Sequence, residues 1–256
     1  MFIASPGKIL VSIDLSQAET WVVAHLANEQ SMKNSLTNSD IHRDTAVVLN
    51  NCTAESVTDI MRYTAKRCNH ALSYRMSYMR LAQVINGESD KPPYVVVSLP
   101  EARRLYEKWH SYYNLKNWWS QLEYELSQSG RVLVTPYGRA RTFFGAWGQE
   151  LFKEATAFIP QSTIADHLNG VVQLELGIEG GLFTIYERFV KTNVVTILNQ
   201  GHDSFISEMD KAVWKDITPQ LVQLIRRPLV VNNETFTIPV DAQVGERWGE
   251  LEKLKL

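Results

Sequence analysis

Four side chains that suit an anionic ligand follow one another at helical spacing in the first third of the chain. Arg62, Lys66, His70 and Tyr74 are each four residues apart, so in a helix they share one face. Two cations, an imidazole and a phenol cannot form a hydrophobic core, and no acidic residue interrupts them. The stripe therefore fits phosphate, sugar and base, and its alternative interpretation is a solvated basic helix face.

Two aspartates stand where the pattern predicts strand ends. Asp14 closes a β-rich run over 9–13, and a carboxylate at a strand end lies at the rim of a sheet, where a metal ion or substrate can reach it. Asp203 lies in a short turn between the apolar strands predicted over 194–200 and 204–209. Both are candidate catalytic residues, although a turn favours Asp in any protein.

Both helices and strands are expected to position these residues. After Asp14 the hydrophobic pattern becomes helical over 17–27, with Ser16 as the expected N-cap and Glu19 completing a capping box. Capping alone would give Glu19 a purely structural role. Ser39 or Asp40 is expected to cap a short helix before the basic one. Residues 86–93 form a polar loop.

The second half of the chain is also expected to contain both helices and strands. Ser98 is expected to begin a helix that runs to about Gln128. A hairpin over 131–144 places Arg139 and Arg141 on one side of its second strand, either against a nucleic-acid backbone or in solvent. A helix over 150–176 is expected to break or kink near Pro160, and a last pair of strands over 229–244 turns at 232–233. The fold class is α+β.

Composition excludes several classes of protein. With 256 residues, 45% of them hydrophobic and 21% charged, the chain is predicted to be globular. Its net charge of -2 requires any nucleic-acid binding to come from local clusters. Cys52 and Cys68 lack metal-site spacing and are expected to be reduced. No charged leader or membrane-length apolar run occurs, so we expect no membrane association and a cytoplasmic location.

Seven separated stretches, all in one order, resemble the palm and fingers of family A DNA polymerases, the family of bacterial polymerase I and of phage replicases. The first is similar to the palm motif D-Y-S-Q-x-E and the third to the fingers helix R-x-x-x-K-x-x-N-F-G-x-x-Y-G. The seven are Asp14-Leu15-Ser16-Gln17-Ala18-Glu19, Asp40-Ile41-His42, Arg62 to Tyr74, Gly138-Arg139-Ala140-Arg141, Pro160 to Asp166, Gly201-His202-Asp203, and Val244-Gly245 with Trp248-Gly249.

The resemblance implies an α+β fold in which a palm, an antiparallel sheet with helices, is joined to mostly helical fingers. Residues 1–16 and 155–256 are then palm and residues 17–154 are fingers. The resemblance begins near Phe2, so the family's thumb and exonuclease domains have no counterpart in these 256 residues. We expect a split or truncated polymerase, whose thumb is supplied by a separate polypeptide or by a missing N-terminal part.

The resemblance also implies an activity: template-directed transfer of a nucleotide from a dNTP to a primer 3′-OH, with primer-template DNA as partner and two Mg²⁺ ions, or Mn²⁺, as cofactors. It assigns site residues only position by position. The implied catalytic residues are Asp14, Asp203 and Lys66, and the metal ligands are Asp14, Leu15 and Asp203. The implied nucleotide-binding residues are Arg62, Lys66, His70, Tyr74, Glu19, Leu15, Gln17 and His42, and the DNA-binding residues are Arg139, Arg141, Gln161, His202 and Asn69.

The chain departs from the family pattern at a few of these positions. Leu15 replaces a Tyr, His70 a Phe or Tyr, and Ser204 a Glu, while Ala71 and Arg75 replace two glycines. None of these changes removes a metal ligand. An alternative function is a catalytically impaired module that holds primer-template without extending it, and metal-dependent primer extension distinguishes the two.

Overall fold

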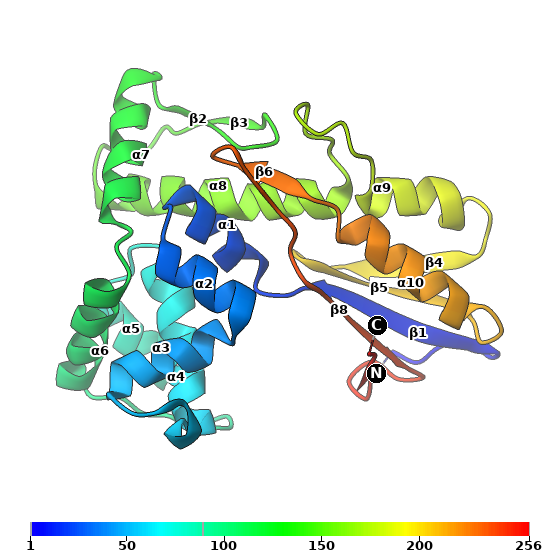
Figure 1. The fold of residues 1–256 in the computed structure, drawn as a ribbon, viewed down its shortest axis with the longest axis horizontal. Coiled ribbons are helices and arrows are strands. Elements are labelled where there is room, and N and C mark those ends of the chain that lie inside the picture. The colour runs from blue at the N-terminus through cyan, green and yellow to red at the C-terminus, as the bar shows by residue number, and fades with distance from the viewer. Residues whose placement is uncertain (1, 89, 256) are drawn as a thin grey trace. The chain divides into compact units, whose positions relative to one another are not determined.

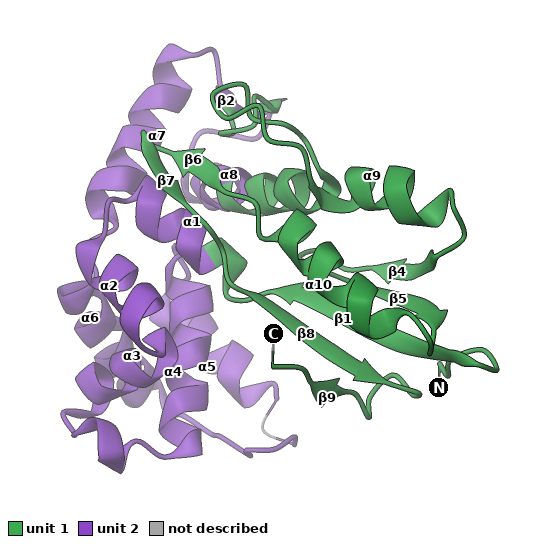
Figure 2. Ribbon diagram, turned by 45° about the vertical axis from the view of Figure 1, so that its right-hand side comes forward, with its two compact units in different colours: residues 1–19, 134–140, 160–256 green, residues 20–133, 141–159 purple. Residues whose placement is uncertain are grey.

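The computed structural model of the chain describes residues 2–88 and 90–255, and the described part divides into two compact units. Unit 1 comprises residues 1–19, 134–140 and 160–256, and unit 2 comprises residues 20–133 and 141–159 (Figure 2). The palm and fingers boundaries expected after residues 16 and 154 stay a prediction, and the two units divide the chain at other positions, with residues 134–140 of the hairpin in unit 1. Position 89, within the loop expected over 86–93, lies outside the described residues.

Unit 1 is built on a five-stranded sheet whose strand order is β4-β5-β1-β8-β9. Figure 1 labels the first four of these strands, and Figure 2 labels all five. Neighbouring strands in this sheet are antiparallel. The central strand β1 is buried at Leu10, Val11, Ile13 and Leu15, which explains its apolar sequence. The strands are β1 Lys8–Leu15, β4 Val195–Gln200, β5 Ser204–Asp210, β8 Val240–Gly245 and β9 Glu252–Lys253.

Helices and a small hairpin accompany this sheet. Helix α10, Trp214–Ile225, packs on β1 and β8, and the short helix α9, Gly181–Ile185, contacts α10. Strands β6, Leu229–Val231, and β7, Glu234–Phe236, pair around Asn232 and Asn233, both of which have positive φ. Two consecutive left-handed residues define the tight turn that suits a two-residue hairpin, so the turn predicted there is confirmed.

Unit 2 is helical, and polar caps set the starts of its helices. Asp40 accepts hydrogen bonds from the N–H groups of His42 and Arg43, Thr58 caps the helix of the basic stripe, and Ser98 accepts from Glu101 N–H. Its helices are α2 Gln30–Asn38, α3 Ile41–Asn50, α4 Asp59–Leu72, α5 Tyr78–Asn86, α6 Leu99–Tyr112 and α7 Lys116–Gln128, with a 3₁₀ turn at Ala54–Ser56.

Four elements pass through the boundaries of the two units. Helix α1, Ala18–Leu26, follows β1, and helix α8, Gln149–Asn169, follows the hairpin of β2, Val132–Val134, and β3, Ala140–Thr142. The hairpin confirms the expectation for residues 131–144.

The single helix expected from Ser98 to about Gln128 is wrong, because the chain breaks it between Tyr112 and Lys116. Tyr113 has an extended backbone and is 1% exposed, and its hydroxyl lies 2.8 Å from Thr45 Oγ1. Leu115 is also fully buried. Burial of these two side chains outweighs helix propensity at this point.

The chain does not break at Pro160, where a break or a kink is expected, since α8 continues through that residue and ends at Asn169 rather than near Leu176. A proline removes one helical hydrogen bond, and here the surrounding packing offsets its loss, since Pro160 is buried. The helix ends where Gly170 adopts a φ of +99°. A Cβ at Gly170 would lie 2.4 Å from the carbonyl oxygen of Gly180, so this close approach requires glycine.

Arg75, which follows α4, fastens the end of the basic helix within unit 2. Its guanidinium donates to Thr156 Oγ1 at 2.9 Å and to the carbonyl oxygen of Trp119 at 2.9 Å, and it pairs with Glu123. It also lies over the rings of Trp119 and Phe152. The substitution of a glycine by arginine, noted in the sequence, therefore creates a buried anchor between α4, α7 and α8.

Both cysteines are free thiols, and burial raises the pKa of the Cys68 thiol to about 12. Among the described residues, no helix combines the length and the apolarity that crossing a membrane would require.

Candidate active site

Asp14 lies at the end of β1, beside the turn that carries Asp203. In the register of β1 and β5, Asp14 is opposite Ser204, and the N–H of Leu15 donates to the carbonyl oxygen of Asp203 at 2.9 Å. Both aspartates are partly exposed. The fold thus brings two acidic residues that are remote in sequence to one end of the same sheet.

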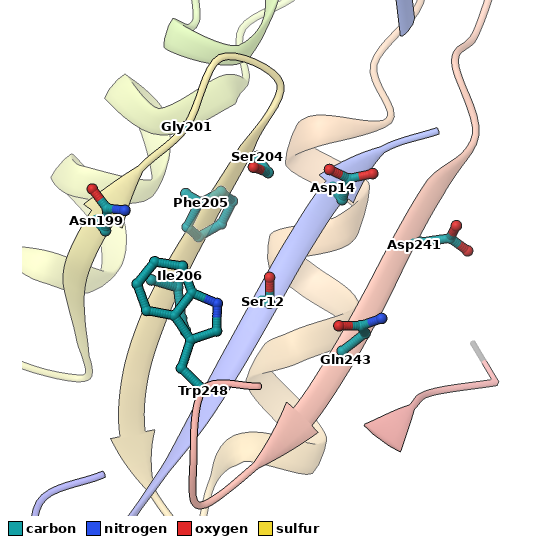
Figure 3. A pocket seen from close by; sticks show the side chains of 10 residues that line it. All are labelled: Ser12, Asp14, Asn199, Gly201, Ser204, Phe205, Ile206, Asp241, Gln243 and Trp248. Atoms are coloured by element: carbon teal, nitrogen blue, oxygen red, sulfur yellow. The ribbon is translucent and has the colours of Figure 1, made fainter. Parts of the chain in front are cut away.

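A pocket of about 330 Å³ opens on this sheet (Figure 3). In the view of Figure 3, Asp14 lies towards the upper end of β1 and Trp248 lies lower down, with Ser12 and Gln243 at heights between them. It is lined by Ser12, Asp14, Asn199, Gly201, Ser204, Phe205, Ile206, Asp241, Gln243 and Trp248. A polar, partly open pocket beside strand-end carboxylates can admit a charged substrate.

Asp241 on β8 is a pocket residue that the sequence analysis missed. It is directly opposite Asp14 in the register of β1 and β8. The hydroxyl of Ser16 donates to its Oδ2 at 2.7 Å, and Lys253 Nζ lies 2.7 Å from its Oδ1. Partial burial acts to raise the pKa of Asp241, but the hydrogen bonds from Lys253 and Ser16 outweigh it and hold this pKa below its ordinary value. A local pattern cannot show which remote strand pairs with β1.

The oxygen donors at this end of the sheet suit Mg²⁺ or Mn²⁺, which prefer carboxylate and carbonyl ligands. Asp14 and Asp203 offer carboxylates, whereas the side chain of Leu15 is apolar and fully buried, so Leu15 can act only through its backbone carbonyl. Its side chain therefore cannot make the nucleotide contact expected of it. No group of three or more His, Cys, Asp or Glu side chains arranged to hold a metal ion occurs within residues 2–88 and 90–255.

The residues after Asp14 differ from the expected capping box. Ser16 directs its hydroxyl to Asp241 rather than to the start of α1, and Gln17 has a positive φ of 56°. Glu19 Oε1 instead lies 3.2 Å from Nε2 of His202, the residue before Asp203. Glu19, Gln17 and His202 are thereby gathered around the end of β1 within unit 1.

The basic face of α4 forms in unit 2 as the spacing predicts, through His70. Lys66 and His70 are exposed, and Arg62 Nε donates to Asp40 Oδ2 at 2.7 Å. Burial acts to raise the pKa of Asp40, but the hydrogen bond and charge of Arg62 outweigh it and lower this pKa. Tyr74 is the exception, because α4 ends at Leu72 and Tyr74 lies in the following turn.

Two residues expected to touch ligands are instead buried beneath this face. Asn69 and His42 are each 2% exposed. Asn69 Nδ2 lies 3.1 Å from His42 Nδ1 and donates to it, and Asn69 Oδ1 accepts from Trp109 Nε1 at 2.8 Å. The expected direct contacts of Asn69 with DNA and of His42 with nucleotide are therefore corrected: both side chains support the helix from below, where the ring of His42 lies 5.8 Å from that of His70.

Buried histidines predict a loss of stability in mild acid. Burial lowers the pKa of His42 to about 4, with help from the charge of His70, and burial lowers that of the fully buried His167 to about 3. Because an unfolded imidazole titrates near 6.5, the unfolded chain binds more protons below that pH, so stability falls as pH decreases from about 6.5 towards 4. Each histidine contributes up to about 1.4 kcal/mol per pH unit.

Burial likewise lowers the pKa of His110 to about 4, so we expect the free energy of unfolding in urea to be about 4 to 6 kcal/mol lower at pH 5 than at pH 7.5. The pKa values of Asp40 and Asp241 are lowered, so these carboxylates titrate below pH 5 and do not contribute to the difference between the two pH values. His42→Gln should reduce the difference between the two pH values. An unfolding free energy that is equal at both would contradict the assignment of neutral buried imidazoles.

The hairpin arginines are already engaged with carboxylates. Arg139 Nε donates to Asp166 Oδ2 at 2.9 Å, and Arg139 keeps 55% of its side chain exposed while Asp166 is buried. Arg141 pairs with Glu154 and lies over the ring of Phe143. The two arginines are each exposed in part, as is Gln161 on α8.

Comparison with known proteins relates the chain to DNA polymerases. The family model described as DNA polymerase family A matches residues 1–250. DNA polymerase I of Pseudomonas aeruginosa is 26% identical over 260 aligned positions, which cover 97% of this chain and 26% of that protein. The thermostable DNA polymerase I of Thermus aquaticus is 29% identical over 141 residues, covering 55% of this chain and 16% of that one.

A solved structure, the POL domain of Pol1 from M. smegmatis in complex with DNA primer-template and dNTP, aligns with a TM-score of 0.76. It is 18% identical, and the match covers 96% of this chain and 41% of that one. The fold is therefore the α+β fold of a polymerase domain. The chain belongs to DNA polymerase family A and spans about a quarter, or less, of the length of these two bacterial relatives.

Proposed function

We propose that this chain is the catalytic part of a DNA-directed DNA polymerase, which transfers a nucleotide from a dNTP to a primer 3′-OH. The observation that carries the proposal is the approach of Asp14 at the end of β1 to the turn of Asp203, in a member of family A. Joining two anionic reactants requires positive charge at the reacting oxygens, which metal ions supply. Two carboxylates are the minimum set of protein ligands for such ions.

Asp14, Asp203 and the backbone carbonyl of Leu15 would hold two Mg²⁺ ions, with Mn²⁺ as a substitute. When bound, such ions lower the pKa of the attacking hydroxyl and neutralise charge on the leaving group. Asp14 and Leu15 lie on the central strand of the sheet, where β1 is flanked by β5 and β8, and Asp203 lies in the turn that precedes β5. A rigid strand end holds the carboxylates without reorganisation during the reaction.

The α4 face of unit 2 is proposed to bind the incoming nucleotide. Lys66 is an exposed cation one helical turn after Arg62, and both suit the triphosphate, with Lys66 also able to donate a proton to the departing pyrophosphate. His70, a further turn on, and Tyr74 would pack against sugar and base. Asp40 fixes the direction of Arg62 by its 2.7 Å hydrogen bond, so that less freedom is lost on binding.

The DNA contacts are proposed for side chains that remain partly exposed. Arg139 is oriented by the buried Asp166, and Arg141, Gln161 and His202 are exposed polar groups that suit primer or template. Because the chain corresponds to a small part of its relatives, we propose that contacts from further polypeptide, separate or continuous with it, complete the grip on the duplex.

The experiment that tests this function is primer extension on a labelled primer-template with and without Mg²⁺. Metal-dependent addition of the complementary nucleotide supports the polymerase. The alternative, a module that binds primer-template without extending it, is favoured by Ser204, which stands where the family has a Glu. Retention of labelled DNA without any extension would support that alternative.

Glu19→Ala is expected to relax the preference for deoxyribonucleotides over ribonucleotides. The half-buried Glu19 stands close to the end of β1, where its carboxylate would crowd the 2′ position of an incoming sugar. The measurement is the ratio of kcat/KM for dNTP and rNTP, expected to fall by about ten-fold or more, which is the size of one steric contact. Glu175→Ala, which alters an exposed glutamate in a turn of unit 1, is the matched control and should leave the ratio unchanged. An unchanged ratio in Glu19→Ala would assign Glu19 a structural role.

A further inference from the structure

The pocket beside the catalytic strand contains a second carboxylate that the mechanism does not use. Asp241 on β8 is directly across from Asp14 on β1. Residues opposite one another in an antiparallel pair project from the same face of the sheet, with Cβ atoms about 4.5 to 5.5 Å apart. Both side chains line the pocket in Figure 3. A ligand bound at Asp14 therefore experiences the charge of Asp241.

Asp241 is not available as a simple metal ligand, because both of its oxygens have partners. Ser16 donates to Oδ2 and Lys253 lies at hydrogen-bond distance from Oδ1, each at 2.7 Å. Lys253 belongs to β9, which pairs with β8 through the register of Gln243 with Lys253. The short strand β9 thus holds a cation on the carboxylate that faces Asp14.

This arrangement solves an electrostatic problem. Like charges directly opposite on neighbouring strands repel each other, and the ammonium of Lys253 neutralises one of the two. Ser16, meanwhile, is the second residue after Asp14, so its bond to Asp241 also fixes the backbone on which Leu15 presents its carbonyl.

We propose that the Asp241–Lys253 ion pair sets the affinity of the active site for its divalent metal ions, with Asp241 as a positioning residue rather than a ligand. This inference rests on the proposed function of Asp14 and Asp203. With the pair intact, the two charges nearly cancel at the site. Loss of Lys253 leaves an additional negative charge beside Asp14, and loss of Asp241 leaves an additional positive one.

The two single substitutions therefore have opposite effects. Lys253→Gln should tighten divalent-metal binding by roughly three- to ten-fold, and Asp241→Asn should weaken it by a similar factor, the range for one charge near a divalent ion at a partly exposed site. Asn retains an acceptor for the Ser16 hydroxyl. In the double variant the Lys253 change should have no carboxylate to expose, so the effects should not add.

The test measures Mn²⁺ binding to the full chain without DNA or nucleotide. Binding is monitored by the electron paramagnetic resonance signal of free Mn²⁺, at low and at high ionic strength. Thermal unfolding checks that each variant is folded. Lys211→Gln is the matched control, because Lys211 also pairs with a carboxylate, Glu246, but at a different pocket of unit 1. It should leave the affinity unchanged, and the effect of Lys253→Gln should shrink at high salt.

Equal or weaker Mn²⁺ binding by Lys253→Gln, or tighter binding by Asp241→Asn, would overturn the inference. Asp14→Asn separates this failure from that of the proposed function. If Asp14→Asn abolishes Mn²⁺ binding while Lys253→Gln leaves it unchanged, only the role of the ion pair is wrong. If Asp14→Asn binds Mn²⁺ as the unaltered chain does, the metal site itself is wrongly placed.

Discussion

Replacement of Asp14 or Asp203 by Asn is expected to reduce nucleotide incorporation by about three orders of magnitude or more, which is the scale for loss of charge stabilisation in a transition state. Asn keeps the size of Asp but removes the negative charge that holds a metal ion. Both residues lie at the end of the central sheet, and neither is one of the exposed arginines proposed to contact DNA. Affinity for primer-template should therefore change little.

The measurement is single-nucleotide incorporation under rapid mixing, combined with primer-template binding by fluorescence anisotropy. Asp210→Asn is the matched control, since Asp210 is an exposed aspartate at the other end of β5. It should retain the activity of the unaltered chain. Incorporation by Asp14→Asn or Asp203→Asn at a near-normal rate would refute the assignment of these carboxylates to the metal ions.

Lys66→Ala is expected to have the next largest effect, a decrease of about 10² to 10³ in kcat/KM for dNTP. Lys66 is exposed on the α4 face, one turn after Arg62, whose own guanidinium is oriented by Asp40. Loss of its charge should weaken stabilisation of the departing pyrophosphate as well as triphosphate binding, so both kcat and KM should change.

Lys66→Arg keeps the positive charge and should recover part of the loss through KM, while kcat stays low if proton donation is part of the role of Lys66. The control is Lys91→Ala, an exposed lysine of unit 2 outside α4, which should behave as the unaltered chain does. A Lys66→Ala variant with unchanged kcat and KM would show that the basic face of α4 is a solvated helix surface without a role in nucleotide binding.

Local signals in the sequence were enough for much of the fold. The start of α3 at Asp40, the turn at Asn232–Asn233 and the strand that ends near Asp14 each depend on a few adjacent residues. They failed where distant packing decides the backbone. Tyr113 ends α6 because its ring is buried and its hydroxyl lies against Thr45, a residue 68 positions away.

The candidate site shows the same division. The spacing of Arg62, Lys66 and His70 predicts one helix face, and α4 provides it. The burial of Asn69 beneath that face depends on Trp109 of another helix, which spacing cannot show. Asp241 was missed because its position opposite Asp14 depends on the pairing of β8 with β1, two strands more than 200 residues apart.

The most direct test of the central claim is templated incorporation of one nucleotide, measured with the pyrophosphate released. The purified chain is assayed alone and with the product of the neighbouring upstream reading frame, on four primer-templates that differ in the templating base. We predict Mg²⁺-dependent addition of the complementary nucleotide in each case, one pyrophosphate per addition, and none by Asp14→Asn. Addition without regard to the template base, or no addition in either assay, would contradict the assignment of polymerase activity to this chain.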